Sequence, residues 1–156
     1  MTLELLRIRV EPKWIDYNGH LNVAYYHMVF DRGTDEFLDR IGLGEASARK
    51  GLGSMFALED HITYQKELKV DDPLLVTLQV LDYDEKRVHY FMKMFHEEVK
   101  YLAATYEHLS MYVDFQSRRS APMPGSARAE LEAIYEAQKD LPRPEEVGRV
   151  VGIRRG

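Results

Sequence analysis

One long helical pattern lies between a first strand-like segment and several later ones, and this order restricts the fold more than any other feature of the chain. Across residues 23–41, apolar side chains recur at spacings of three, four, seven and four, which place them on one face of a helix. The gap in that face holds Gly33 and Thr34, two small residues that allow a sheet to pack closely against the helix. The apolar face consists of Val23, Tyr26, Phe30, Phe37 and Ile41.

Strand-like segments flank this helix on both sides. Residues 3–10 alternate between apolar and polar side chains until Pro12, which ends a strand. Four more segments follow the helix in direct succession, and their short links indicate antiparallel pairing. Because a lone helix with one apolar face must be covered, we expect an α+β fold in which an antiparallel sheet wraps around one long central helix. The four later segments are residues 55–68, 74–81, 87–96 and 100–115, and a short peripheral helix is expected at 126–139.

The chain length of 156 residues fits one domain with a sizeable core and is too short for two domains that each have such a core. We therefore expect a single domain over residues 1–156. Its core covers about residues 3–115, and a C-terminal helix and tail occupy residues 116–156.

Charge and composition exclude several functional classes. The formal net charge of −5 argues against a nucleic-acid partner held by a general basic surface. The absence of cysteine excludes disulfides, thiolate zinc sites and a cysteine nucleophile, and the six histidines show no metal-binding spacing, so no metal site is expected. No apolar run approaches the ~18 residues of a membrane span, and residues 1–10 lack the apolar block of a signal peptide. We therefore expect a cytoplasmic protein without a membrane partner.

The stretch immediately before the helix, residues 14–22, concentrates polar chemistry. It brings an acid, Asp16, together with a glycine, a histidine and two amides within seven residues. The start of a helix offers unpaired backbone N–H groups and a partial positive charge. A carboxylate at that position suits acyl chemistry, because Asp16 can act on water or on carbon while the N–H groups hold an oxyanion.

The pattern Asp16-x-x-Gly19-His20-x-Asn22, in this order of elements, resembles the hotdog-fold acyl-CoA thioesterases of the 4-hydroxybenzoyl-CoA thioesterase type. The resemblance covers about residues 5–115. It implies a single hotdog fold, a hydrolase that splits a small acyl-CoA into the free acid and coenzyme A, and no cofactor beyond the coenzyme A of the substrate. It also implies a homo-oligomer, either a dimer or a tetramer, whose sites are shared between protomers.

A narrower resemblance concerns the acyl group. Residues 14–20, 104–108 and 148–155 are similar to betainyl-CoA thioesterases of carnitine catabolism, which also occur fused to carnitine dehydrogenase. The resemblance therefore makes betainyl-CoA the first substrate to test. Two other classes stay open: a non-catalytic acyl-CoA binding module, and a hotdog acyl-CoA dehydratase or hydratase.

Under this resemblance Asp16 is the catalytic carboxylate, which either attacks the thioester carbonyl or activates a water molecule. The alternative is a structural aspartate of the turn or the helix entry. His20 either hydrogen-bonds Asp16 or the thioester oxygen, or holds the loop together. Asn22 caps the helix, orients the attacking water or substrate, or does both. The backbone N–H groups of Val23 and Ala24 are the candidate oxyanion donors.

Aromatic residues crowd the same part of the sequence. Trp14, Tyr17 and Tyr25 are candidates for a cage around a trimethylammonium group, because aromatic faces attract quaternary ammonium ions. Core packing is the alternative, and Tyr26 is assigned to the core because it lies on the apolar face of the helix.

Two acid–histidine pairs lie on predicted strands. Glu59 and His61 are two residues apart and share a face, whereas the adjacent Glu107 and His108 point to opposite faces. We take Glu59 as the first choice for a second catalytic acid beside Asp16 and His61 as a substrate contact, either within one chain or across a dimer interface. A solvated strand face is the alternative. Cations that follow the last strand are candidates for holding coenzyme A phosphates: Arg118, Arg119, Arg149, Arg154 and Arg155.

Overall fold

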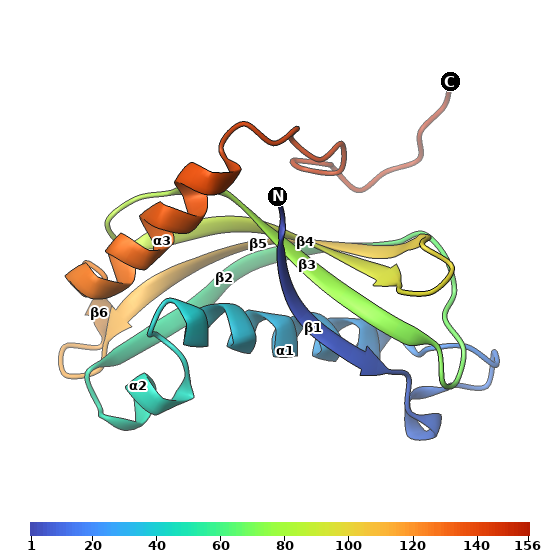
Figure 1. Cartoon of the computed structure of the whole chain (residues 1–156), viewed down its shortest axis with the longest axis horizontal. Coiled ribbons are helices and arrows are strands. Elements are labelled where there is room, and N and C mark those ends of the chain that lie inside the picture. The colour runs from blue at the N-terminus through green and yellow to red at the C-terminus, as the bar shows by residue number, and fades with distance from the viewer.

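The computed structural model describes residues 1–156 and shows a curled sheet that encloses one long helix (Figure 1). The strands are β1 (Leu3–Arg9), β2 (Gly53–Tyr64), β3 (Pro73–Tyr83), β4 (Arg87–His96), β5 (Leu102–Asp114) and β6 (Arg119–Ser120). The helices are α1 (Val23–Arg40), α2 (Glu45–Arg49) and α3 (Gly125–Gln138), and a 3-10 turn covers Pro12–Trp14.

The sheet has the strand order β1-β3-β4-β5-β2, with β6 paired to β5, and all of its pairings are antiparallel. The expected α+β arrangement is therefore confirmed. The chain forms β1, passes through α1 under the sheet, and returns to build β2 at the opposite edge. One edge of β2 is paired with β5 and its other edge has no partner strand.

Helix α1 lies against the concave face of the sheet through its apolar side. Of the predicted face, Tyr26, Phe30, Phe37 and Ile41 are buried, and only Val23 at the first position is exposed. Close packing at the gap in this face is confirmed. A Cβ added to Gly33 would lie 3.3 Å from Met92 Sδ and 3.3 Å from Val76 Cγ1, so a larger residue would require these side chains to move by a few tenths of an ångström.

Local signals define both ends of α1. At its start, Asn22 Oδ1 accepts a hydrogen bond from the Ala24 backbone N–H at 2.9 Å, which confirms the capping role expected of Asn22. At its end, Gly42 adopts a φ of +76°, and the Leu43 N–H donates to the Leu38 carbonyl at 2.8 Å. Glycine takes this left-handed conformation without the steric cost of a side chain, so the helix stops there.

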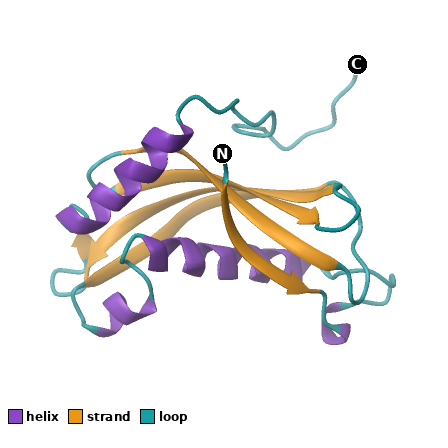
Figure 2. Cartoon of the chain, viewed as in Figure 1, coloured by secondary structure: helices purple, strands orange, loops and turns teal.

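Helix α3 lies on the face of the sheet opposite to α1 (Figure 2). Its last residue, Gln138, is 2% exposed and binds the edge of β3. The Gln138 Oε1 accepts from the Val80 N–H at 2.8 Å, and its Nε2 donates to the Leu78 carbonyl at 3.0 Å. The pairing of β1 with β3 begins at Leu3 and Leu78, so this side chain continues the hydrogen bonding where the strand β1 has not yet begun.

The predicted boundaries differ from the observed ones in a few places. The second strand ends at Tyr64 rather than at residue 68, because the N–H groups of Gln65 and Lys66 both turn toward the Ala103 carbonyl. Strand β5 begins at Leu102 rather than at residue 100, since Lys100 has a φ of 65° that no strand adopts. The short elements α2, β6 and the 3-10 turn were not expected from the sequence. None of the helices combines the length and apolar character needed to cross a membrane.

Candidate active site

The loop before α1 is a closed turn that holds Asp16 in place. Ile15 and Leu21 form an isolated antiparallel bridge, and the Asp16 N–H donates to the His20 carbonyl at 3.1 Å. Gly19 adopts a φ of +78°, which glycine takes without steric cost, and its N–H donates to the Asp16 carbonyl at 3.0 Å. The Asp16 carboxylate accepts from the Asn18 N–H through Oδ1 at 2.8 Å. Its other oxygen, Oδ2, has no hydrogen-bond partner in the chain and is free for chemistry.

The start of α1 leaves its first backbone N–H group, that of Val23, free beside this loop. Of the first three N–H groups, that of Ala24 donates to Asn22 Oδ1 and that of Tyr25 donates to the Asn22 carbonyl. The assignment of the Ala24 N–H as an oxyanion donor therefore needs correction, because the cap already occupies it. The N–H of Val23 has no acceptor in the chain, and Val23 is 58% exposed. Helix termini leave such donors for ligands.

His20 does not reach Asp16. Its Nδ1 lies 3.2 Å from the Leu21 carbonyl oxygen, and its side chain is half-buried. This contact matches the loop-holding alternative rather than a hydrogen bond to the carboxylate.

The proposed aromatic cage does not form around Trp14. The Trp14 side chain is 1% exposed, it stacks on Tyr25 with ring centroids 5.8 Å apart, and the guanidinium of Arg32 lies 5.4 Å from its ring centroid. Because the indole is buried against these neighbours, Trp14 packs in the core and has no face open to a ligand. Tyr17, in contrast, is 96% exposed at the tip of the loop.

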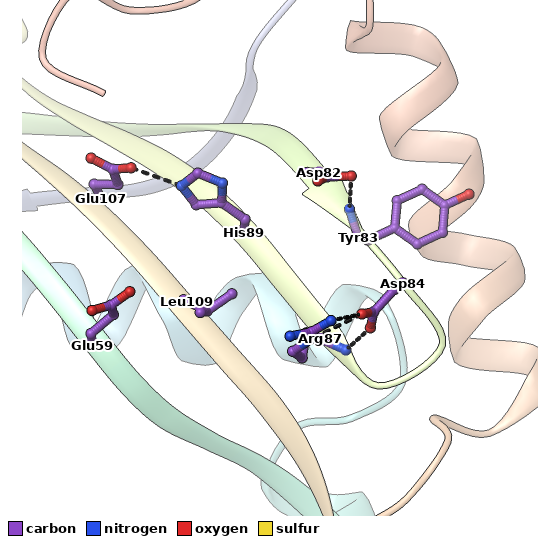
Figure 3. Close-up of a pocket in the computed structure, with 8 residues that line it drawn as sticks. All are labelled: Glu59, Asp82, Tyr83, Asp84, Arg87, His89, Glu107 and Leu109. Carbon is purple, nitrogen blue, oxygen red and sulfur yellow. Dashed lines mark hydrogen bonds and ion pairs between the residues drawn. The ribbon is translucent and has the colours of Figure 1, made fainter. Parts of the chain in front are cut away.

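Glu59 and His61 share a face of β2, as expected, and this face points away from α1. They line outward-facing cavities with His89 and Glu107, and neither Asp16 nor His20 lines these cavities. Figure 3 shows Glu59 and the hydrogen-bonded pair of His89 and Glu107 on strands that pass in front of α1. The His89 Nε2 and Glu107 Oε1 atoms are 2.8 Å apart. The structure therefore does not bring Glu59 to Asp16 within one chain.

The adjacent Glu107 and His108 do point to opposite faces, which confirms the expected alternation. Glu107 lies outside, where its Oε2 also accepts from the Gly148 N–H at 2.8 Å. His108 faces α1 and is 4% exposed. The five arginines considered for phosphate binding are not brought together. Arg118 lies over the rings of Phe56 and Phe115, whereas Arg149 and Arg154 belong to the C-terminal tail.

The concave face carries a polar cluster that the sequence interpretation missed. Asp60, which lies between Glu59 and His61 and points the other way, places Oδ2 3.3 Å from His27 Nε2 and 3.4 Å from the Tyr106 hydroxyl. The Tyr106 hydroxyl lies 2.7 Å from His108 Nδ1. The strand alternation that places Glu59 and His61 on one face also places Asp60 on the opposite face.

Burial sets the protonation of this cluster. It lowers the pKa of His108, an effect opposed by the nearby carboxylates of Asp60 and Asp31, so the imidazole is held neutral. Burial likewise raises the pKa of the Tyr106 hydroxyl well above its ordinary value. The cluster is thus a hydrogen-bonding network that runs from His27 through Asp60 and Tyr106 to the buried His108.

One long helix wrapped by a curled antiparallel sheet defines the hotdog class of folds. Comparison with known proteins narrows this class. Residues 10–134 match the model of the thioesterase-like superfamily, and the chain belongs to that family.

The relatives that match this protein align with most of its length. A betainyl-CoA thioesterase of Pseudomonas aeruginosa is 38% identical over 144 residues, which cover 92% of this chain and 91% of the relative. An L-carnitine dehydrogenase/betainyl-CoA thioesterase of Rhizobium meliloti is 35% identical over 98% of this chain, which spans 31% of that longer protein. The protein SAV2348 of Staphylococcus aureus, solved in complex with CoA, is 30% identical with a TM-score of 0.92, covering 99% of this chain and 96% of that one.

Proposed function

We propose that this protein is an acyl-CoA thioesterase that hydrolyses betainyl-CoA to the free acid and coenzyme A. One observation carries the proposal. The Asp16 carboxylate has a free oxygen, Oδ2, and the N–H of Val23 at the start of α1 has no acceptor. The similarity to betainyl-CoA thioesterases over nine-tenths of both chains supports the choice of substrate.

Two routes lead to the same products. In the first, an Asp16 oxygen bonds to the thioester carbon, the C–S bond breaks, the thiolate leaves as coenzyme A, and water hydrolyses the resulting anhydride. In the second, Asp16 takes a proton from a water molecule whose oxygen attacks the same carbon, the C–S bond breaks, and the proton goes to the leaving thiolate of coenzyme A. In both, negative charge develops on the carbonyl oxygen, and the Val23 N–H is the donor placed to stabilise it.

The test is release of free thiol from a panel of CoA thioesters. The panel contains betainyl-CoA, its neutral isostere 3,3-dimethylbutanoyl-CoA, acetyl-CoA and a 3-hydroxyacyl-CoA. We expect the highest kcat/KM with betainyl-CoA. Absence of thiol release from every member would contradict the proposal and leave a binding module, and conversion of the 3-hydroxyacyl-CoA to an enoyl-CoA without thiol release would indicate a dehydratase.

The proposed reaction needs no metal or redox cofactor, because Asp16 and backbone groups supply its chemistry. Activity is therefore expected to survive dialysis against a chelator at its full rate. An enzyme of this kind acts where CoA thioesters occur, and we place it in the cytoplasm.

A second copy of the chain is the proposed partner. Strand β2 is 12 residues long, has one unpaired edge, and exposes Phe56, Leu58 and Tyr64 by 38%, 48% and 49%. A long exposed edge with apolar side chains is a template for pairing with another strand. We propose a homodimer joined through β2, with a tetramer as a further assembly, and light scattering measures the number of copies.

A further inference from the structure

A cavity of about 420 Å³ lies between the second half of α1, the short helix α2 and the strands β2 and β5. Its floor is formed by buried residues of the helix and the sheet, among them Leu38, Leu43, His108 and Ser110. Its rim is acidic. Four exposed carboxylates surround the opening: Asp31, Asp35 and Asp39 of α1 and Glu45 of α2.

The carboxylates of α1 form a stripe that the helix itself disfavours. Asp31, Asp35 and Asp39 follow one another at intervals of four residues, so like charges are neighbours on the helix surface. Asp39 also lies in the last turn, where the helix dipole is negative. None of the three takes part in an ion pair, whereas Glu45 pairs with Arg49.

The nearest cations on α1 are turned elsewhere. The guanidinium of Arg32 lies over Trp14, and that of Arg40 donates to the Glu4 carbonyl at 2.7 Å. Burial, followed by the charges of Asp31 and Asp39, raises the pKa of Asp35, which reflects negative charge that the chain leaves uncompensated.

A second feature of the cavity, independent of the acids, points to a ligand. The Ser110 side chain lines the cavity floor, is 3% exposed, and is the one buried side chain of the protein whose polar atom has no hydrogen-bond partner. Leaving a buried hydroxyl unpaired costs stability unless something else contacts it. Ser110 is also one of the residues that line this cavity.

We propose that this cavity binds a quaternary ammonium group. The apolar walls of Leu38, Leu43 and Met55 contact the methyl groups, the acidic rim balances the charge, and Ser110 Oγ faces the polarised N-methyl hydrogens. A cavity of this size with apolar walls fits a bulky, weakly hydrated cation better than a small, strongly hydrated one.

The inference rests on the proposed function for the identity of the cation. Asp35 lies about 18 Å beyond Val23 along α1, at a rise of about 1.5 Å per residue, so one chain cannot hold a betainyl group here and attack it with its own Asp16. The ammonium group therefore belongs either to a thioester attacked by Asp16 of the partner subunit across the β2 edge, or to free betaine released by the reaction.

The experiment has two arms. In the kinetic arm, kcat/KM is measured for betainyl-CoA and for 3,3-dimethylbutanoyl-CoA, which has the same shape without the charge. Asp35→Asn is expected to lower the kcat/KM ratio of the charged to the neutral substrate by about tenfold. The reason is that the Asp35 carboxylate attracts a partly desolvated cation and the neutral amide does not. In the binding arm, tetramethylammonium and betaine are titrated calorimetrically into the wild type and the variants.

Two further variants separate a loss of cation binding from a loss of folded protein. Ser110→Ala removes no hydrogen bond, so it folds at least as well as the wild type, and it is expected to weaken tetramethylammonium binding about twofold to threefold. Glu36→Gln removes an acid from the same helix that does not line the cavity, and it is the matched control, expected to change neither arm.

Each outcome decides between the sources. A lowered preference with Asp35→Asn assigns the site to the substrate, and an unchanged preference with lost betaine binding assigns it to the free product. Equal responses of Asp35→Asn and Glu36→Gln in both arms overturn the cation site, as does equal binding of K⁺ or Mg²⁺. If no thioester is hydrolysed, the proposed function fails, while tetramethylammonium binding still decides whether the cation site exists.

Discussion

The two ends of helix α1 carry different kinds of chemistry. At its N-terminal end, backbone geometry dominates. A closed loop leaves one oxygen of Asp16 free, and the cap leaves the N–H of the exposed Val23 free. At its C-terminal half, side chains dominate, because acids surround a cavity with the buried Ser110 at its floor. Reaction and recognition are thus separated along one helix, and a symmetric pair of chains is the simplest way to bring them together.

The largest effect is expected at the N-terminal end. Asp16→Asn keeps the loop hydrogen bond to the Asn18 N–H through the amide oxygen but removes the negative charge. We expect kcat to fall about 100-fold to 10,000-fold, since the residue supplies either the nucleophile or the base. Thermal unfolding of the variant should match the wild type. A variant with a near-normal rate would remove Asp16 from the mechanism.

Val23→Pro tests the backbone donor without touching a side chain of the site. Proline is favoured at the first position of a helix, and the preceding Asn22 has a φ of −66° and a ψ of 142°, which a following proline tolerates. Apart from the exposed valine side chain, the group lost is the free N–H, so we expect kcat to fall about 100-fold with little change in stability.

Val23→Ala is the control for this substitution. It removes the valine side chain and retains the N–H, and it should keep the wild-type rate. Equal rates for Val23→Pro and the wild type would show that the oxyanion is held elsewhere.

The sequence was informative at this end of the helix and much less so at the other, for physical reasons. The start of α1 at Val23, the cap at Asn22 and the turn at Gly19 follow from local chemistry, and all three are observed. The burial of Trp14 was not predicted, because the core that surrounds it, including the stacked Tyr25 ring, forms only when the chain folds.

The acidic cavity lay beyond a sequence-based prediction altogether. An acid stripe on an exposed helix face has the pattern of an ordinary solvated surface. Only the tertiary structure shows that this stripe borders a cavity and that Ser110 lacks a partner. Likewise, alternation separated Glu59 from Asp60 but could not tell which face of the sheet the helix would cover.

A smaller effect is expected from substitutions at the two ends of α1, the N-terminal cap Asn22 and the C-terminal Gly42. Asn22→Ala and Gly42→Ala should each lower the free energy of unfolding by about 1 kcal/mol, the first by losing a side-chain cap and the second by forcing alanine into a φ of +76°. Only Asn22→Ala should also change kcat, because it frees the Ala24 N–H beside the site. Urea denaturation together with thiol release separates the two, and an equal loss of activity in Gly42→Ala would contradict the division of roles along α1.

The smallest effect concerns stability at the acidic end, and its sign is opposite to the others. Burial and the carboxylates of Asp31 and Asp39 raise the pKa of Asp35 in the folded chain above its unfolded value. The folded state therefore binds the proton more tightly, and the contribution of Asp35 to stability falls as the pH rises through the interval between the two pKa values. At pH 7 the carboxylate is ionised and repelled, so Asp35→Asn should raise the free energy of unfolding by about 0.2–0.5 kcal/mol. At a pH below about 3.9, the unfolded pKa of an aspartate, the gain should vanish. Urea denaturation at both pH values measures the change in unfolding free energy for Asp35→Asn, and Glu36→Gln is measured in the same way for comparison. A variant that is more stable yet binds tetramethylammonium more weakly would show that the acid stripe is kept for recognition, and a variant less stable at pH 7 would show that it is part of the scaffold.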